Sequence, residues 1–270
     1  MQTKYVIAQL PKAGLGNKLF VWAKAYLHAK NNKINLLTFG LNDFSIGPIL
    51  RRENVKRFYL GQFKTNSFSS FFHSKLLSYF DTSRITRFDE IPHWSNYFET
   101  IRDQRTMVIE GFSNLLSRST SKELAQVNIY PEIGVHVRLG DFKALQQGTD
   151  FKNVGATRTP FDYFITTISR LRNHLGENLK VSIFSDGYAH ELSSLLQLNN
   201  VEYVSPRKDV IDLLLLSRSK YIITSAGSSF SEWAGFLSNA PIILHPDHIH
   251  GRIRIEKNLF EGSIEDFIKT

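Results

Sequence analysis

The sequence predicts an α/β protein built on parallel sheets. Two observations support this class: short apolar segments alternate with longer segments of helical periodicity, and several of the apolar segments end on Gly, Ser or Asp. Short, continuously apolar strands are typical of a parallel sheet covered by helices on both faces. A third observation is the length of 270 residues, which suits two α/β halves of ordinary domain size.

The first half begins with a predicted strand over residues 5–10 and a helix over about 18–30, whose apolar residues recur every three or four positions. A second strand is expected over 34–39. Residues 41–105 show little periodicity, and we expect one helix there, near 68–79. A strand over 106–109 and a helix over 121–126 complete this half.

The second half alternates strands and helices more regularly. Thr159 and Pro160 predict the start of a helix over 161–175, with Thr as the N-cap and Pro at the first helical position. The remaining strands are expected over 134–138, 179–185, 201–204, 221–224 and 242–244. The remaining helices are expected over 189–198, 209–217 and 229–237. We place the domain boundary at residues 128–131, which gives domains of 1–128 and 129–270.

The segment 134–141 (GVHVRLGD) predicts a buried strand that ends on an arginine, a glycine and a carboxylate. Groups at the carboxyl end of a strand in an open α/β sheet face the ligand crevice. Arg138 would therefore stand where its planar guanidinium can bind two phosphate oxygens. The alternative is that Arg138 and Asp141 only pair with each other.

Two other loops resemble anion sites. Gly14 and Gly16 form a glycine-rich turn between a strand and a helix, where backbone amides can approach an anion. The turn lacks the third glycine of a dinucleotide fingerprint and the Gly-Lys-Ser/Thr of a Walker loop. The segment 225–231 contains four serines before a helix, which suits N-capping and phosphate binding equally well.

Four segments together resemble the ordered motifs of the α-1,2-fucosyltransferases, glycosyltransferase family 11. They are residues 14–20 (GLGNKLF), 136–141 (HVRLGD), 184–186 (FSD) and 228–233 (SSFSEW). Residues 109–112 (IEGF) match more loosely a strand end of that family. The chain is identified as a divergent, bacterial-type member.

The resemblance implies a GT-B-like fold, with two Rossmann-like domains facing across a cleft. The first would be the acceptor side and the second would bind GDP. The implied activity is inverting transfer of L-fucose from GDP-fucose to a galactoside hydroxyl, in an α-1,2 linkage, on a surface glycan such as O-antigen or capsule. Alternatives are transfer from another GDP-hexose, or an inactive α/β protein that binds a nucleotide or nucleic acid.

The resemblance also implies roles for individual residues. Arg138 would bind the β-phosphate of the donor, and His136 and Asp186 would recognise guanine. The glycine turn with Asn17, and the serines at the start of the last helix, would complete the donor site. These further donor-binding residues are Gly14, Gly16, Asn17, Ser228 and Ser229.

The chain departs from the family pattern at several positions. The family's arginine pair is reduced to Arg138 and Leu139, and Lys18 and Leu19 replace the usual Gln-Met. Ala234 stands where the family has a second aromatic residue. The loss of the second arginine bears on the class of acceptor and on activity.

Two carboxylates are candidates for the base that deprotonates the acceptor. Glu110 would end the strand over 106–109, or cap a helix after Ser113. Asp141 could also serve, although a carboxylate three residues from Arg138 is expected to orient that arginine.

Departure of the diphosphate needs positive charge or hydrogen-bond donors. The sequence contains no Asp-x-Asp motif, so we expect no metal cofactor, with Arg138 and the helix N-terminus in its place. The segment 245–250 (HPDHIH) could ligate zinc or nickel, but all its ligands lie within that one short loop.

Composition places further limits on the function. The chain has no cysteine, which excludes disulfides and thiolate chemistry, and it shows neither a signal peptide nor an apolar run of membrane-spanning length. We expect a cytoplasmic protein. The net charge of +8 is spread along the chain without a nucleic-acid-binding motif. It suits a diphosphate donor and peripheral contact with an anionic inner membrane leaflet.

Overall fold

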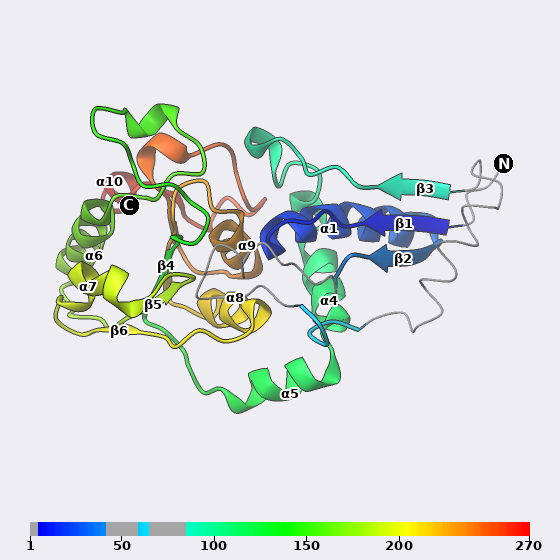
Figure 1. Cartoon of the computed structure of the whole chain (residues 1–270), viewed down its shortest axis with the longest axis horizontal. Helices are drawn as coiled ribbons and strands as arrows, with labels where there is room; N and C mark the ends of the chain where they lie inside the picture. Colours follow the sequence, from blue (N-terminus) through cyan, green and yellow to red (C-terminus); the bar gives the residue numbers. More distant parts are fainter. Residues whose placement is uncertain (1–4, 42–58, 65–84) are drawn as a thin grey trace. The chain divides into compact units, whose positions relative to one another are not determined.

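The computed structural model describes residues 5–41, 59–64 and 85–270. The chain divides into two compact units, and it passes from the first to the second between Val127 and Asn128. Each unit has its own sheet, and every strand pair in both sheets is parallel (Figure 1). This confirms the predicted α/β class.

The sheet of the first unit has the order β2-β1-β3. Its strands are β1 (Tyr5–Gln9), β2 (Asn35–Phe39) and β3 (Ile85–Phe88). Its α-helices are α1 (Leu15–Asn32), α4 (Arg105–Leu115) and α5 (Arg118–Gln126). Two short 3₁₀ turns, η2 (Trp94–Asn96) and η3 (Arg102–Gln104), connect β3 to α4.

The strand expected over 106–109 is wrong, because these residues lie in α4. The β-branched and apolar run had predicted a strand, but the spacing of Val108 and Phe112 lets both pack into the core from one helix face. Gly111 allows the ring of Tyr26 in α1 to come close, since a Cβ at position 111 would stand 2.4 Å from that ring. The strand that completes the sheet is β3, which was not predicted.

Some expectations lie outside the described residues, including the helix near 68–79. Within the described part of the chain, no helix is both long enough and apolar enough to cross a membrane.

The sheet of the second unit has the order β6-β5-β4-β7-β8-β9. Its strands are β4 (Ile133–Val137), β5 (Val181–Ser185), β6 (Val201–Tyr203), β7 (Tyr221–Ile223), β8 (Ile242–Ile243) and β9 (Glu261–Gly262). Its α-helices are α6 (Phe161–Leu175), α7 (Ser193–Leu196), α8 (Asp209–Ser217), α9 (Ser229–Leu237) and α10 (Ile264–Phe267). Figure 1 shows α6 and α7 on one side of the strands and α8 and α9 on the other.

Most predicted elements of this unit are confirmed, and α6, α8 and α9 have the predicted bounds. The predicted N-cap of α6 is wrong. Pro160 occupies the N-cap position, and the hydroxyl of Thr159 instead accepts the amide hydrogen of Ala226, 2.9 Å away in the loop after β7. The strand β9 and the helix α10 were not predicted.

Candidate functional site

Three neighbouring strands of the second unit end on polar residues at one edge of the sheet. Strand β4 pairs in parallel with β5 on one side and with β7 on the other. Arg138 follows β4, Asp186 follows β5, and the serine-rich loop follows β7. Because parallel strands have their carboxyl ends at the same edge, these groups converge as predicted.

Arg138 lies between two carboxylates. Its Nη1 donates to Oδ2 of Asp186 at 2.5 Å, and its Nη2 donates to Oδ1 of Asp141 at 2.6 Å. The guanidinium also lies over the ring of Phe142, 5.4 Å from its centroid. The pairing of Arg138 with Asp141, one of the two alternatives, is therefore present, and Asp186 is a second partner. An arginine has five N–H donors, so these two bonds orient the group and leave donors for a ligand.

Asp186 also organises the backbone of the loop after β4. Its Oδ1 accepts the amide hydrogens of Leu139 at 2.8 Å and Gly140 at 3.1 Å. The side chain is nearly buried, and a buried carboxylate needs such donors to stay charged. Asp186 therefore fixes both the backbone that carries Arg138 and the direction of the guanidinium.

Ser225, after β7, links the ends of β4 and β7. Its hydroxyl accepts the amide hydrogen of Arg138 at 2.8 Å and donates to the carbonyl oxygen of His136 at 2.8 Å. The hydroxyl of this buried serine is thus both a hydrogen-bond acceptor and a donor, and the two bonds hold the end of β4 in one conformation. The sequence predicts Ser225 only as a member of the serine-rich loop over 225–231, without this bridging role.

His136 is a buried, uncharged ring on β4. It stacks against Phe230 of α9 with 4.8 Å between centroids and 28° between planes. Burial is the main cause that lowers the pKa of His136 to about 3, and the charge of Arg138 lowers it further, while Asp186 opposes the shift. A flat neutral ring of this kind can pack against a nucleobase and offer one hydrogen-bond donor or acceptor.

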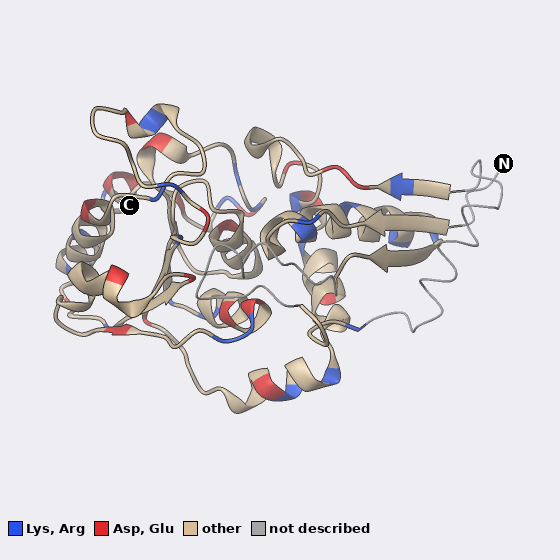
Figure 2. Cartoon of the chain, viewed as in Figure 1, with Lys and Arg blue, Asp and Glu red and all other residues tan. Residues whose placement is uncertain are grey.

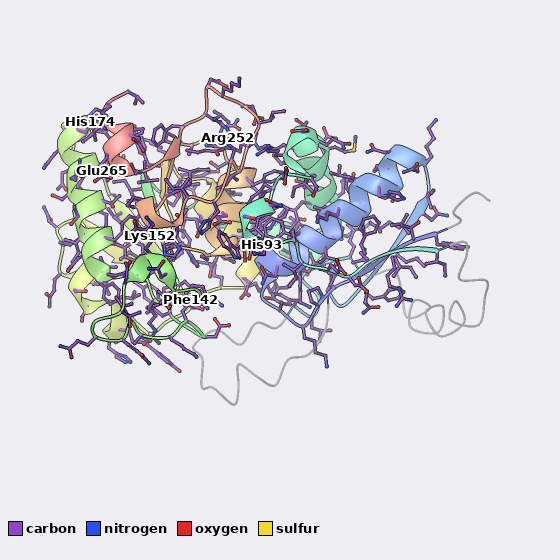
Figure 3. All side chains as sticks on the ribbon, turned by 90° about the horizontal axis from the view of Figure 1, so that it is seen from above. His93, Phe142, Lys152, His174, Arg252 and Glu265 are labelled. Atoms are coloured by element: carbon purple, nitrogen blue, oxygen red, sulfur yellow. The ribbon has the colours of Figure 1, made fainter. Side chains whose placement is uncertain are left out.

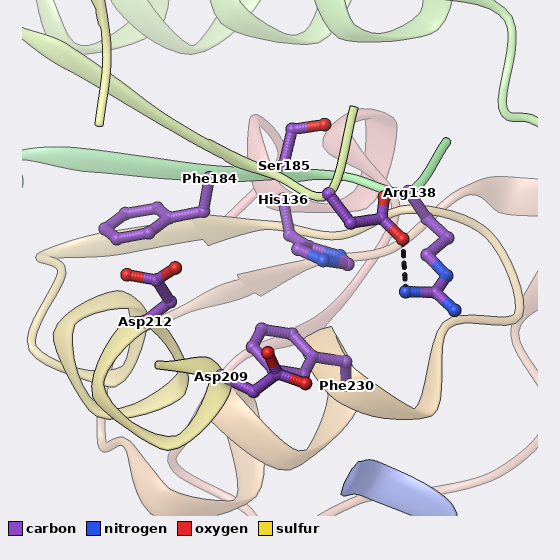
Figure 4. A pocket seen from close by; sticks show the side chains of 8 residues that line it. His136, Arg138, Phe184, Ser185, Asp209, Asp212 and Phe230 are labelled. Atoms are coloured by element: carbon purple, nitrogen blue, oxygen red, sulfur yellow. Dashed lines mark hydrogen bonds and ion pairs between the residues drawn. The ribbon is translucent and has the colours of Figure 1, made fainter. Parts of the chain in front are cut away.

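A pocket opens at this edge, entirely within the second unit (Figure 4). Its lining combines aromatic rings with three carboxylates and the guanidinium of Arg138. The lining residues are His136, Arg138, Phe184, Ser185, Asp186, Asp209, Asp212 and Phe230. Asp209 and Asp212 were missed from the sequence, because they belong to the first turn of α8 and reach the pocket only through tertiary packing.

The two predicted phosphate-binding serines lie at the start of α9. Ser228 is the N-cap residue, but its side chain makes no capping hydrogen bond, and its Oγ lies 3.4 Å from Nδ1 of His136. Ser229 is the first residue of the helix. The start of α9 is therefore next to the pocket residues His136 and Phe230.

Leu139, at the position of the family's second arginine, is a core residue. Its side chain is 2% exposed. A Cβ added to Gly187 would stand 2.3 Å from its Cδ1, so the two positions are in close contact. The absence of a side chain at Gly187 thus leaves room for the side chain of Leu139.

The glycine turn of the first unit follows β1. Gly14 is the N-cap of α1, and Gly16 and Asn17 belong to the first turn of that helix. The Oδ1 atom of Asn17 is buried and has no hydrogen-bond partner among the described residues. The donor-binding role of these three residues stays a prediction.

Glu110 does not end a strand. It is an exposed residue in the middle of α4. It does not cap the helix after Ser113 either, because Ser117 is the N-cap of α5. Glu110 therefore does not lie at the carboxyl edge of the first sheet. The strand-end position predicted for Glu110 depended on the strand predicted over 106–109.

The histidine segment 245–250 packs around an aromatic residue. The ring of Phe151 lies 4.8 Å from both His245 and His248, and Nε2 of His248 lies 3.1 Å from the carbonyl oxygen of Phe151. Within the described residues, no three His, Asp or Glu side chains come together as a possible metal site. The contacts of His245 and His248 with Phe151 therefore pack the loop after β8 against the short turn at 151–153.

Comparisons with known proteins agree with this geometry. Residues 48–245 match the model of the family described as glycosyl transferase family 11. Among solved structures, the chain is similar to the NodZ α-1,6-fucosyltransferase soaked with GDP-fucose, at a TM-score of 0.55 and 14% identity, over 90% of this chain and 95% of that one. A second structure, of NodZ from Bradyrhizobium, gives a TM-score of 0.53 at 14% identity, over 90% of this chain and 96% of that one. This likeness supports the predicted GT-B class. No curated protein gives a significant sequence match.

Proposed function

Because the chain belongs to glycosyl transferase family 11, we propose that it is a fucosyltransferase that takes L-fucose from GDP-fucose. The finer proposal, which follows from the sequence motifs, is transfer to a galactoside hydroxyl in an α-1,2 linkage on a surface glycan. The NodZ structures support the donor, since one was soaked with GDP-fucose and another was co-crystallised with GDP.

The observation that carries the proposal is the guanidinium of Arg138, held at the mouth of a pocket lined by rings and carboxylates. In the proposed reaction, the acceptor oxygen attacks the anomeric carbon as the bond to the β-phosphate oxygen breaks. The configuration at the anomeric carbon inverts and GDP leaves with the bonding electron pair. Arg138 would donate to the β-phosphate oxygens, where this negative charge develops.

The start of α9 would support the same charge. Ser228 and Ser229 offer hydroxyls and amides at a helix N-terminus, which carries partial positive charge. We therefore propose catalysis without a metal cofactor. Turnover should persist in EDTA; loss of turnover that a divalent cation restores would contradict this part of the proposal.

The aromatic part of the pocket would hold guanine. Guanine presents its N1–H and its amino group on one edge, and a carboxylate can accept both. Asp186 stays in the proposal as a guanine-reading group, but its oxygens also serve Leu139, Gly140 and Arg138. Asp209 and Asp212 line the same pocket and are proposed to share this role. His136 and Phe230 would pack against the base.

The acceptor hydroxyl must also lose a proton during transfer, and we propose that the carboxylate of Asp141 accepts it. Asp141 is held by Arg138 at 2.6 Å and partly exposed, so its first role is to orient the guanidinium. Glu110 retains no structural argument for the role of base. In the first unit, Gly14, Gly16 and Asn17 stay in the proposal as donor-binding residues.

The experiment that tests the function is a GDP-release assay with purified protein and GDP-fucose, with and without galactoside acceptors. Acceptor-dependent release of GDP, with a fucosylated product found by mass spectrometry, is the expected result. Binding of GDP without transfer to any glycan would support the alternative of an inactive nucleotide-binding protein.

A further inference from the structure

The loop after β3 places an exposed tryptophan at the carboxyl edge of the first sheet. Strand β3 pairs in parallel with β1, so the loop that follows β3 leaves the sheet beside the glycine turn that follows β1. Trp94 lies at the start of the turn η2 in this loop and is 51% exposed. Ligands of open α/β sheets bind outside the carboxyl ends of the strands, which is where this residue stands.

The turn that carries Trp94 is packed against helix α1. Tyr97, just after the turn, stacks on Phe20 of α1 at 4.5 Å between centroids. Phe98 packs edge-on against the same ring at 4.8 Å and is buried. An exposed aromatic side chain on an anchored turn loses little further freedom when it binds a ligand.

A histidine lies directly beside the indole. The rings of His93 and Trp94 are 4.8 Å apart (His93 is labelled in Figure 3). Nδ1 of His93 lies 2.8 Å from Oγ of Ser95 and accepts the amide hydrogen of the same serine. The exposed imidazole can therefore offer a nitrogen to a ligand as hydrogen-bond donor or acceptor, depending on its tautomer.

Two acidic residues lie earlier in the loop that carries Trp94. Asp89 and Glu90 are both exposed and follow β3 directly, and Figure 2 shows this segment in red. The loop therefore combines a flat apolar ring with carboxylate acceptors and an imidazole. These groups are complementary to a pyranose ring, which has an apolar face of C–H groups and a rim of hydroxyls.

The size of the apolar surface argues against a protein partner. Among the described residues of the first unit, only Leu60 and Trp94 are large, exposed apolar side chains. Exposed polar residues flank Trp94, including His93 and Asn96. A stable protein interface needs about 800 Å² on each partner, with a larger apolar centre.

We infer that Trp94 is an acceptor-binding residue, whose indole face stacks against a pyranose ring of the acceptor glycan. His93, Asp89 and Glu90 would hydrogen-bond to the hydroxyls of that sugar. This inference rests on the proposed glycosyltransferase function, since it identifies where the second substrate binds.

Fluorescence provides a test that does not depend on turnover. The chain has three tryptophans, and the other two, Trp22 and Trp233, are 2% and 0% exposed. Acrylamide quenching of tryptophan emission therefore reports mainly on Trp94. The probes are lactose, N-acetyllactosamine, chitotriose and mannobiose, each added to the full chain saturated with GDP.

At least one of these sugars is expected to protect the emission from acrylamide, and Trp94→Phe should remove the quenchable component. In the transfer assay, Trp94→Ala should raise the acceptor KM by about two- to tenfold and leave the KM for GDP-fucose unchanged. Trp94→Phe, which keeps an aromatic face, should retain most of the acceptor affinity.

Two results would overturn the inference. One is that GDP binds but none of the four sugars changes the quenching. The other is that Trp94→Ala and Trp94→Phe both keep the wild-type acceptor KM. Failure of the proposed function is distinguishable from either result, because none of the acceptors would then release GDP from GDP-fucose.

Discussion

The guanidinium of Arg138 and the carboxylate of Asp186 are joined at 2.5 Å across two neighbouring strands. The same carboxylate accepts two backbone amides of the loop that carries the arginine. Asp186 thus sets the position of the backbone and the direction of the side chain together.

Arg138→Lys should lower kcat/KM by about 10² to 10³ while the fold survives. A lysine keeps the positive charge but cannot reproduce the planar, two-pronged geometry that binds two phosphate oxygens. The matched control is Arg170→Lys, which alters a surface ion pair with Glu265 on another face of the unit. Near-normal turnover in Arg138→Lys would remove this residue from the donor site.

Asp186→Ala should weaken binding of GDP more than binding of UDP. Guanine offers a carboxylate two donors, whereas uracil offers one, and hydrogen bonds to a charged group contribute about 1.5–3 kcal/mol, or about ten- to a hundredfold in affinity. Calorimetric titration with both nucleotides measures the difference. Equal losses would limit Asp186 to holding Arg138 and leave base recognition to Asp209 and Asp212.

The stability of the second unit should depend on the charge state of His136. Burial lowers its pKa to about 3, against about 6.5 in an unfolded chain. Between these values the unfolded state binds more protons, so this residue makes stability rise with pH by up to about 1.4 kcal/mol per unit. Burial raises the pKa of Glu232 to about 7, which gives the opposite slope between about 4.5 and 7.

The contribution of His136 can be separated from that of Glu232 by comparing the unfolding free energies of the wild type and a His136 variant. His136→Phe keeps a ring against Phe230 but removes the titration, so the difference between wild type and variant in urea unfolding isolates the histidine. That difference should change steadily from pH 4 to pH 6.5 and become constant above. A difference independent of pH would contradict the buried, uncharged state of His136.

Leu139→Arg, which restores the family's arginine pair, should destabilise this chain by more than about 2 kcal/mol. The side chain at position 139 is buried, and a buried charge without a partner is costly. Leu145→Arg, on an exposed part of the same loop, is the control for added charge. An unchanged melting temperature together with faster turnover would show that the pair can be rebuilt here.

The second unit was largely predictable because its strands are short and apolar and its helices have clear starts. The convergence of Arg138, Asp186 and the serine loop followed from strand ends alone, since parallel strands share one carboxyl edge. The carboxylates Asp209 and Asp212 could not be found this way. Their pattern is that of an ordinary acidic first turn of a helix, and only the packing of α8 brings them to the pocket.

The first unit was less predictable for a physical reason. The segment 106–109 is rich in residues that favour strands, and tertiary contacts of Val108 and Phe112 override this preference in α4. The true third strand, β3, has only four residues and is not fully buried, so its pattern is weak. Because a strand was predicted over 106–109, Glu110 was placed at a strand end. Because β3 was not predicted, the loop that carries Trp94 was not recognised as following a strand.

Donor binding shows directly whether the pocket beside Arg138 binds a GDP-linked sugar. We would titrate the wild-type chain calorimetrically with GDP-fucose, GDP-mannose and UDP-galactose. We expect GDP-fucose to bind most tightly and UDP-galactose to bind at least tenfold more weakly. UDP-galactose binding as tight as that of GDP-fucose, or no binding of any of the three, would contradict it.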